Sequence, residues 1–98
     1  MKLVVTADAE ADLTAIGEYI ARDDPDGSAE FVEALLNQCA RIVERPLAYR
    51  LRNEWGLTIR AKRHGSHLIL FEIDGEAVVI LRVLHGRQDI LAILTDKP

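Results

Sequence analysis

Apolar residues recur at helical spacing in the first half of the chain and at strand spacing in the second. Residues 2–5 form a short apolar run that predicts a strand. Thr6 offers an N-cap oxygen, and apolar positions at helical spacing follow it as far as residue 20. Asp24, followed by a proline, ends this helix and begins another, because the residue before proline avoids the helical region and proline suits the first turn. The second helix is predicted to run to about Glu44, so the two form a helical hairpin.

The second half alternates with the period of β-strands. After an irregular segment, three strands joined by turns are predicted, at residues 57–62, 67–73 and 77–84. The order β-α-α-β-β-β predicts one α+β domain over residues 1–98. In it, the N-terminal strand and the antiparallel C-terminal strands form a small sheet packed against the helical hairpin.

Both faces of this predicted sheet are apolar. Ile69 and Phe71 point to one side, and Leu68 and Leu70 point to the other. A sheet that is apolar on both faces is usually covered on both, and the predicted helices suffice for one. Either a partner protein covers the second face, or the irregular segment and the C-terminal tail fold over it. We expect the partner, because exposed apolar patches commonly mark interaction sites.

Charge is distributed unevenly behind the net value of −4. Residues 1–33 hold nine acids and two bases, whereas residues 41–67 hold seven bases and two acids. The basic segment suits an acidic peptide or a phosphate backbone, and the alternative is a solvated face balanced by the acidic helices. The single cysteine, Cys39, excludes an internal disulfide and falls on the apolar side of the second helix, as a core residue would. No apolar run reaches signal or membrane length, so we expect a cytoplasmic protein without a membrane partner.

The last predicted strand ends in a polar cluster. Arg82 interrupts an apolar run, and it should pair with a carboxylate because an unpaired buried charge is costly. The carboxylate could come from this chain or from a partner, and we expect an internal pair. Asp89 is predicted to cap a helix or to pair with Arg82 or Arg87. This cluster, formed by Arg82, His85, Arg87 and Asp89, is predicted to hold the strand to the C-terminal tail and to shape a surface used against a target.

The three histidines could act as acid and base, since imidazole titrates near neutrality. Their spacing fits no metal motif, and solvated histidines are ordinary at strand ends and turns. No cofactor or metal is expected. Trp55 is either an interface anchor or a lid on the core.

Several segments resemble the RelE/ParE superfamily of bacterial toxins, and the ParE-like branch most closely. They are residues 65–71 with Asp74-Gly75, residues 82–87 with Asp89, and Leu13 and Tyr19. The resemblance implies the toxin of a type II toxin–antitoxin module, neutralised by a ParD-type antitoxin that wraps it. It further implies a non-enzymatic inhibitor of DNA gyrase that meets operator DNA only through the antitoxin.

RelE-type members of this superfamily cut messenger RNA on the ribosome, and they are the main alternative. Thr58 and Arg60 stand where that branch carries lysines, and His67 stands where it carries an arginine. Arg87 matches its arginine after the last strand, but the tail at residues 90–95 has no tyrosine. This is a poor set for RNA cleavage, which needs a base, an acid and cations. A third reading is a degenerate, non-toxic module that only binds the antitoxin.

Two sets of candidate site residues follow, and no catalytic residue is assigned. The candidates for target inhibition are Arg60, His67, Arg82, His85, Arg87 and Asp89. The candidates for antitoxin binding are Arg41, Arg45, Arg50, Arg52, Trp55, Leu68, Leu70, Val78 and Ile80.

Overall fold

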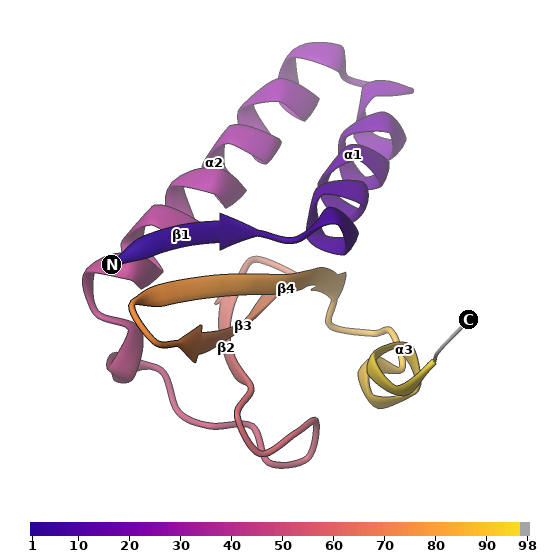
Figure 1. The fold of residues 1–98 in the computed structure, drawn as a ribbon. Helices are drawn as coiled ribbons and strands as arrows, with labels where there is room; N and C mark the ends of the chain where they lie inside the picture. The colour runs from indigo at the N-terminus through magenta and orange to yellow at the C-terminus, as the bar shows by residue number, and fades with distance from the viewer. Residues whose placement is uncertain (97–98) are drawn as a thin grey trace.

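The computed structural model describes residues 1–96, and it has the predicted order of elements with one short helix added at the end (Figure 1). The elements are β1 (Lys2–Val5), α1 (Ala7–Ala21), α2 (Pro25–Glu44), the 3-10 turn η1 (Pro46–Ala48), β2 (Arg60–His64), β3 (His67–Asp74), β4 (Ala77–His85) and α3 (Ile90–Thr95). The predicted α+β fold class is therefore confirmed.

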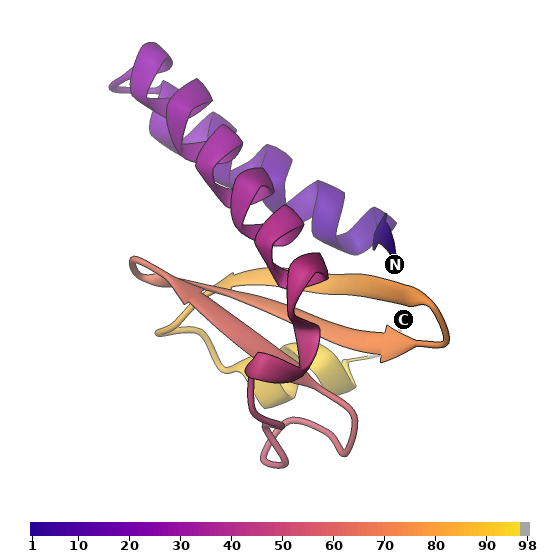
Figure 2. The same ribbon diagram turned by 90° about the vertical axis from the view of Figure 1, so that its left-hand side faces the viewer.

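The four strands form one mixed sheet in the order β1-β4-β3-β2. β1 runs parallel to β4, and the other neighbours are antiparallel. The α1–α2 hairpin covers one face and extends beyond the sheet, whereas α3 and the loop before β2 lie against the other face (Figure 2). The molecule thus has three layers rather than the two that the sequence predicted.

The helix caps lie where the sequence placed them. The Thr6 side chain accepts a hydrogen bond from the Ala9 amide, and the Asp24 side chain accepts one from the Gly27 amide. These caps satisfy amides that have no partner within the helix. The hairpin is closed by a hydrogen bond of 2.6 Å from the Ser28 hydroxyl to the Gly17 carbonyl.

β2 begins three residues later than predicted, and it includes two residues assigned to the turn. Leu57 is 84% exposed and lies outside the strand. Gly65 adopts a φ of +59° in a two-residue turn, so His64 pairs with His67 and the ladder continues almost to the turn. Turn geometry, rather than the apolar alternation, sets the register.

The core under the helical hairpin combines both helices with one face of the sheet. Its buried residues are Ala9, Leu13, Leu35, Cys39, Ile42, Ile69, Phe71, Val78, Ile80 and Val83. Cys39 is part of this core as predicted, and burial raises the pKa of its thiol to about 11. A thiol in such surroundings is inert at neutral pH.

The expectation of an apolar face left open for a partner is wrong. Leu68, Leu70, Leu84 and Ile90 form a second buried cluster. Partly buried side chains of the loop before β2 and of α3 pack against this cluster. They are Trp55, Ile59, Ile93 and Leu94. A six-residue helix suffices because the loop supplies the rest of the cover, so the self-covered arrangement is the observed one.

The apolar candidates for antitoxin binding are consequently interior residues. Leu68 is 4% exposed, and Leu70, Val78 and Ile80 are fully buried. Val78 and Ile80 also belong to the helix-facing core, on the opposite side of the sheet from Leu68 and Leu70. A partner cannot contact these four side chains unless a covering layer moves.

One acidic side chain completes the outer edge of β4. β1 has four residues and β4 has nine, so β1 leaves the second half of that edge unpaired. Thr6 donates to the carbonyls of Ile80 and Leu81 at 3.1 Å each. Asp12 of α1 then accepts from the Val83 amide at 2.9 Å. The start of α1 therefore replaces the missing part of β1.

The same carboxylate pairs with Arg82, which confirms the predicted internal ion pair. Its two oxygens accept from Nε and Nη2 of Arg82, each at 2.8 Å. This hydrogen bonding raises the pKa of the guanidinium. The prediction that Arg82 ties β4 to the C-terminal tail is wrong, because the partner lies 70 residues earlier, on α1.

Arg82→Ala should destabilise the fold because it leaves the Asp12 carboxylate in place without its guanidinium partner. The expected loss in the free energy of unfolding is about 3 kcal/mol, at the low end for a broken buried pair. The low end applies because the Arg82 side chain keeps 26% of its exposure. Urea unfolding measures this loss as a lower midpoint, with an unchanged dependence of the unfolding free energy on urea concentration.

The exposed Arg87→Ala variant is the matched control, and its change should stay within about 0.5 kcal/mol. In the double variant with Asp12→Ala, the loss should be smaller than the sum of the single losses. Additive losses would mean that the two side chains do not act as a pair.

Candidate functional site

The three histidines lie side by side across one end of the sheet. His64 of β2 pairs with His67 of β3, which in turn pairs with His85 of β4. Directly opposed residues share a face, so the row continues the helix-facing side beyond Ile69 and Val83. Their positions at strand ends and turns follow from the sequence, but only the strand register brings the three rings together.

Phe31 of α2 packs on this row. Its ring centroid lies 5.8 Å from that of His64 and 5.3 Å from that of His67. His67 and His85 are also in edge-to-face contact at 5.3 Å. Within residues 1–96, Nδ1 of His67 is buried without a hydrogen-bond partner.

This environment disfavours a charge on His67. Burial lowers the pKa of His67 below its ordinary 6.5, and the neighbouring His85 and His64 lower it further. At neutral pH the ring is therefore uncharged, and it serves as a packing residue between strands and helix.

Hydrogen bonds within the turn after β4 fix the positions of the other polar residues at this end of the sheet. The His85 amide donates to the Gln88 side chain at 2.7 Å, and the Arg87 amide donates to Nδ1 of His85 at 3.1 Å. With Nδ1 acting as an acceptor, the neutral ring carries its proton on Nε2. Asp89 caps α3 by accepting from the Ala92 amide, which confirms the predicted cap.

A small polar pocket of about 220 Å³ opens beside this turn. It is lined by Arg63, Ser66, His85, Gly86 and Arg87. The Gly86 amide donates to the Ser66 carbonyl at 2.8 Å, which joins the two turns that form the wall. Arg63 was absent from the sequence-based candidates because it was assigned to a turn. A two-residue turn at Gly65 would have placed it on the strand.

Arg60 does not join this end of the sheet. It faces Phe71, four residues along β2 from His64, and so lies about 13 Å from the histidine row at 3.3 Å per residue. Its Nη1 donates to the Tyr49 carbonyl at 2.6 Å. The two arginines that match ribonuclease positions, Arg60 and Arg87, therefore do not converge.

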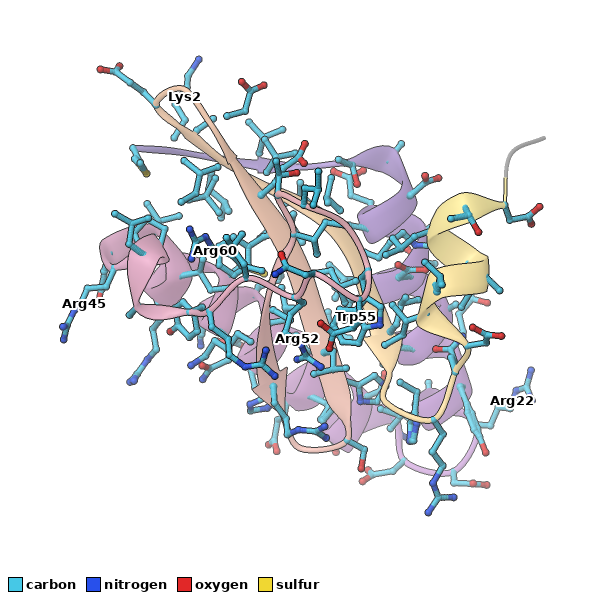
Figure 3. All side chains as sticks on the ribbon, turned by 90° about the horizontal axis from the view of Figure 1, so that it is seen from below. Lys2, Arg22, Arg45, Arg52, Trp55 and Arg60 are labelled. Atoms are coloured by element: carbon cyan, nitrogen blue, oxygen red, sulfur yellow. The ribbon has the colours of Figure 1, made fainter. Side chains whose placement is uncertain are left out.

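The basic candidates for antitoxin binding fall into two groups. Arg41, Arg45 and Arg50 are exposed, and Arg45 points outward at the edge of the view in Figure 3. Arg52 is paired with Glu54 at 3.0 Å and lies 4.0 Å above the Trp55 ring. Trp55 packs on the second core, so the structure supports the lid rather than the anchor.

Open apolar surface lies elsewhere, on the helical hairpin and on β1. A groove of about 640 Å³ runs between α1 and α2, with Leu13, Val32 and Leu36 in its wall and Glu10 and Glu18 at its rim. Leu3 and Val4 of the edge strand β1 are about two-fifths exposed, at 40% and 41%. Apolar residues at helical spacing are expected to face the core, so this open surface could not be recognised from the sequence.

Within residues 1–96, no group of three or more metal-ligating side chains is placed to hold a metal ion. In the same part of the chain, no helix is long and apolar enough to cross a membrane.

Residues 3–90 match the family model of the ParE toxin of the type II toxin–antitoxin system parDE. Among solved structures, a chain of the chromosomal ParDE system from P. aeruginosa superposes with a TM-score of 0.77 at 22% identity, covering 87% of this chain and 95% of that one. A chain of the toxin–antitoxin complex RelBE2 from Mycobacterium tuberculosis gives a TM-score of 0.63 at 27% identity, covering 86% and 88%. No curated protein matches the sequence significantly.

Acidification should destabilise the folded protein through His67. The unfolded ring titrates near 6.5 and the folded ring titrates lower, so the unfolded state binds more protons as the pH falls between these values. The stability that the neutral ring provides is complete above pH 6.5 and is lost as the pH falls through the folded pKa. Melting temperatures measured at steps from pH 8 to about 5, above the main carboxylate titrations, report this loss.

His67→Phe keeps an aromatic ring against Phe31 and removes the titration, so its melting temperature should vary less over this range. Arg22→Gln, at the far end of the helical hairpin, should follow the wild-type curve. Identical pH dependence in wild type and His67→Phe would assign the acid sensitivity to other groups.

Proposed function

The chain belongs to the family of ParE toxins of type II toxin–antitoxin systems, and from this premise we propose that it inhibits DNA gyrase by binding and is neutralised by a ParD-type antitoxin. The family match over residues 3–90 carries the proposal. In this proposal the protein acts in the cytoplasm, has no membrane partner, and reaches operator DNA only through the antitoxin.

The arrangement of side chains favours inhibition by binding over RNA cleavage. Cleavage needs an acid, a base and cations gathered around one phosphate. Arg60 is held by the Tyr49 carbonyl at the start of the edge strand β2, whereas Arg87 lies in the turn after the end of β4. Thr58, at a lysine position of the ribonuclease branch, donates its hydroxyl to Glu72 at 3.0 Å.

One observation favours the ribonuclease alternative. His67 and His85 are neighbouring imidazoles at the sheet end that also carries Arg63 and Arg87. Two histidines can serve as acid and base without a metal. Against this, Nδ1 of His85 is engaged by the Arg87 amide and the His67 ring packs under Phe31. Both rings therefore have structural roles that compete with catalysis.

The antitoxin, in this proposal, binds the open apolar surface of the hairpin and β1 rather than the covered face of the sheet. An amphipathic helix suits the groove beside Leu36, and an extended segment suits the edge of β1. The acidic rim at Glu10 and Glu18 favours basic residues in the part of the antitoxin that lies there. Exposed Arg41 and Arg45 favour acidic residues near the end of α2.

Purified toxin should inhibit supercoiling by gyrase and leave cleaved DNA, and the antitoxin added in excess should restore supercoiling. Arg87→Ala should weaken this inhibition without loss of stability, because Arg87 is exposed and lies at the proposed target surface. Arg22→Gln, remote from that surface, is the control for loss of charge alone. Full inhibition by Arg87→Ala would remove this residue from the target surface, and no inhibition by wild type would exclude gyrase.

Added to translating ribosomes, the protein should leave messenger RNA intact, because its cations do not converge. Primer extension on the translated message reads this directly. Codon-phased cuts that vanish in His67→Gln or His85→Gln, with folding retained, would establish the ribonuclease alternative. A chain that inhibits neither gyrase nor translation, yet binds the antitoxin, would be the degenerate module.

A further inference from the structure

The pocket beside the last turn gathers positive charge that the protein itself does not neutralise. Arg63 lines it from near the end of β2, and Arg87 lines it from the turn after β4. Both side chains are exposed. Within residues 1–96, the two ion pairs of the structure belong to Arg52 and Arg82. No carboxylate lines the pocket in that part of the chain.

The shape of the pocket keeps these charges accessible. Gly86 forms part of its wall, and a Cβ at this position would lie 3.6 Å from Nη1 of Arg63 and 3.5 Å from the Ser66 carbonyl. A larger side chain at residue 86 would therefore be in van der Waals contact with the guanidinium and would take up part of the pocket. Ser66 belongs to the same lining, and its hydroxyl can add a neutral donor.

From this geometry we propose that Arg63, Arg87 and Ser66 bind a phosphate group of a nucleic-acid backbone. Guanidinium groups match phosphate oxygens with paired donors, and the arginine fork suits this ligand better than a point charge does. The pocket of about 220 Å³ has room for one such group.

The surroundings favour a nucleic acid over an acidic peptide. Peptide recognition usually needs a large apolar side chain at the centre of the contact, whereas phosphate contacts do not. The exposed large apolar residues of the described chain lie at other places, and none is within residues 60–90. Exposed polar or small residues surround the pocket instead, at Gly65, Ser66, Gly86 and Gln88.

The inference deepens the proposed function and rests on it for its biological meaning. A toxin bound to gyrase would touch the backbone of the DNA segment that the enzyme holds, and so would retain the cleaved complex. The contact reads no sequence and is separate from operator recognition through the antitoxin. With a net charge of −4, the protein has little general attraction for DNA, so this pocket should dominate its affinity.

The test uses the full chain with inorganic phosphate and a short DNA duplex as probes, observed by amide NMR and by fluorescence anisotropy of the labelled duplex. Both probes should shift the amide signals of Ser66, Gly86 and Arg87. Arg63→Gln and Arg87→Gln should each weaken duplex binding several-fold. Each should also lower the slope of log affinity against log salt by about 0.9, the value for one lost phosphate contact.

Two further variants separate charge from access. Gly86→Val keeps both arginines and should weaken duplex binding, because its side chain fills part of the pocket that Gly86 lines. Arg22→Gln removes the same charge far from the pocket and should bind like wild type. Unchanged melting temperatures show that each variant remains folded.

Duplex affinity that is the same in all four variants and wild type would overturn the inference. If inorganic phosphate shifts the amide signals and the duplex does not, the pocket is a free-anion site and the inference is overturned. If a polyglutamate peptide binds in place of DNA, the inference is overturned and the pocket belongs to a protein partner. Gyrase inhibition with unaltered duplex binding in the variants refutes the pocket and leaves the proposed function standing. Variant-sensitive duplex binding without gyrase inhibition supports the pocket and refutes the proposed function.

Discussion

The fold depends on one carboxylate, that of Asp12, which ties α1 to the outer edge of β4. Asp12 accepts from the Val83 amide and from both arms of the Arg82 guanidinium, and it does so from the second turn of α1. Without it, the outer edge of β4 beyond β1 would expose unpaired backbone, as open edges do. Because Asp12 is fixed on a helix, the same contact also sets where α1 lies on the sheet.

The position of α1 determines which ends of the molecule are open. Since α2 is joined to α1 by Ser28 and Gly17, it follows α1 across the sheet and brings Phe31 onto the histidine row. The outer side of the hairpin keeps a groove beside Leu36, remote from the turn that carries Arg87. The hairpin groove and the polar pocket are therefore separate surfaces, so the antitoxin and the target of the proposed function can each have one.

The covered second face changes how the C-terminal tail is understood. α3 buries Ile90 against Leu68, Leu70 and Leu84, and its N-cap Asp89 follows directly on the turn of the polar pocket. The tail thus supports the turn structurally. A truncation of the tail would remove core contacts together with any contact to a target, so point substitutions at exposed positions such as Arg87 are the informative ones.

The sequence alone determined the order of the helical hairpin and the four strands, and both caps of the hairpin, because apolar periodicity and the Thr6 and Asp24 caps are local signals. It also determined that Arg82 needs a carboxylate, since the cost of an unpaired charge in an apolar strand is independent of the fold. It did not determine which carboxylate, because Asp12 is 70 residues away and only the packing of α1 against β4 brings it there. The histidine row, the Arg63–Arg87 pocket and the cover over Leu68 and Leu70 were likewise decided by tertiary structure. Each depends on strand register or on a short helix folding back, and these are set by turn geometry and by competition for apolar surface, which periodicity along the chain does not encode.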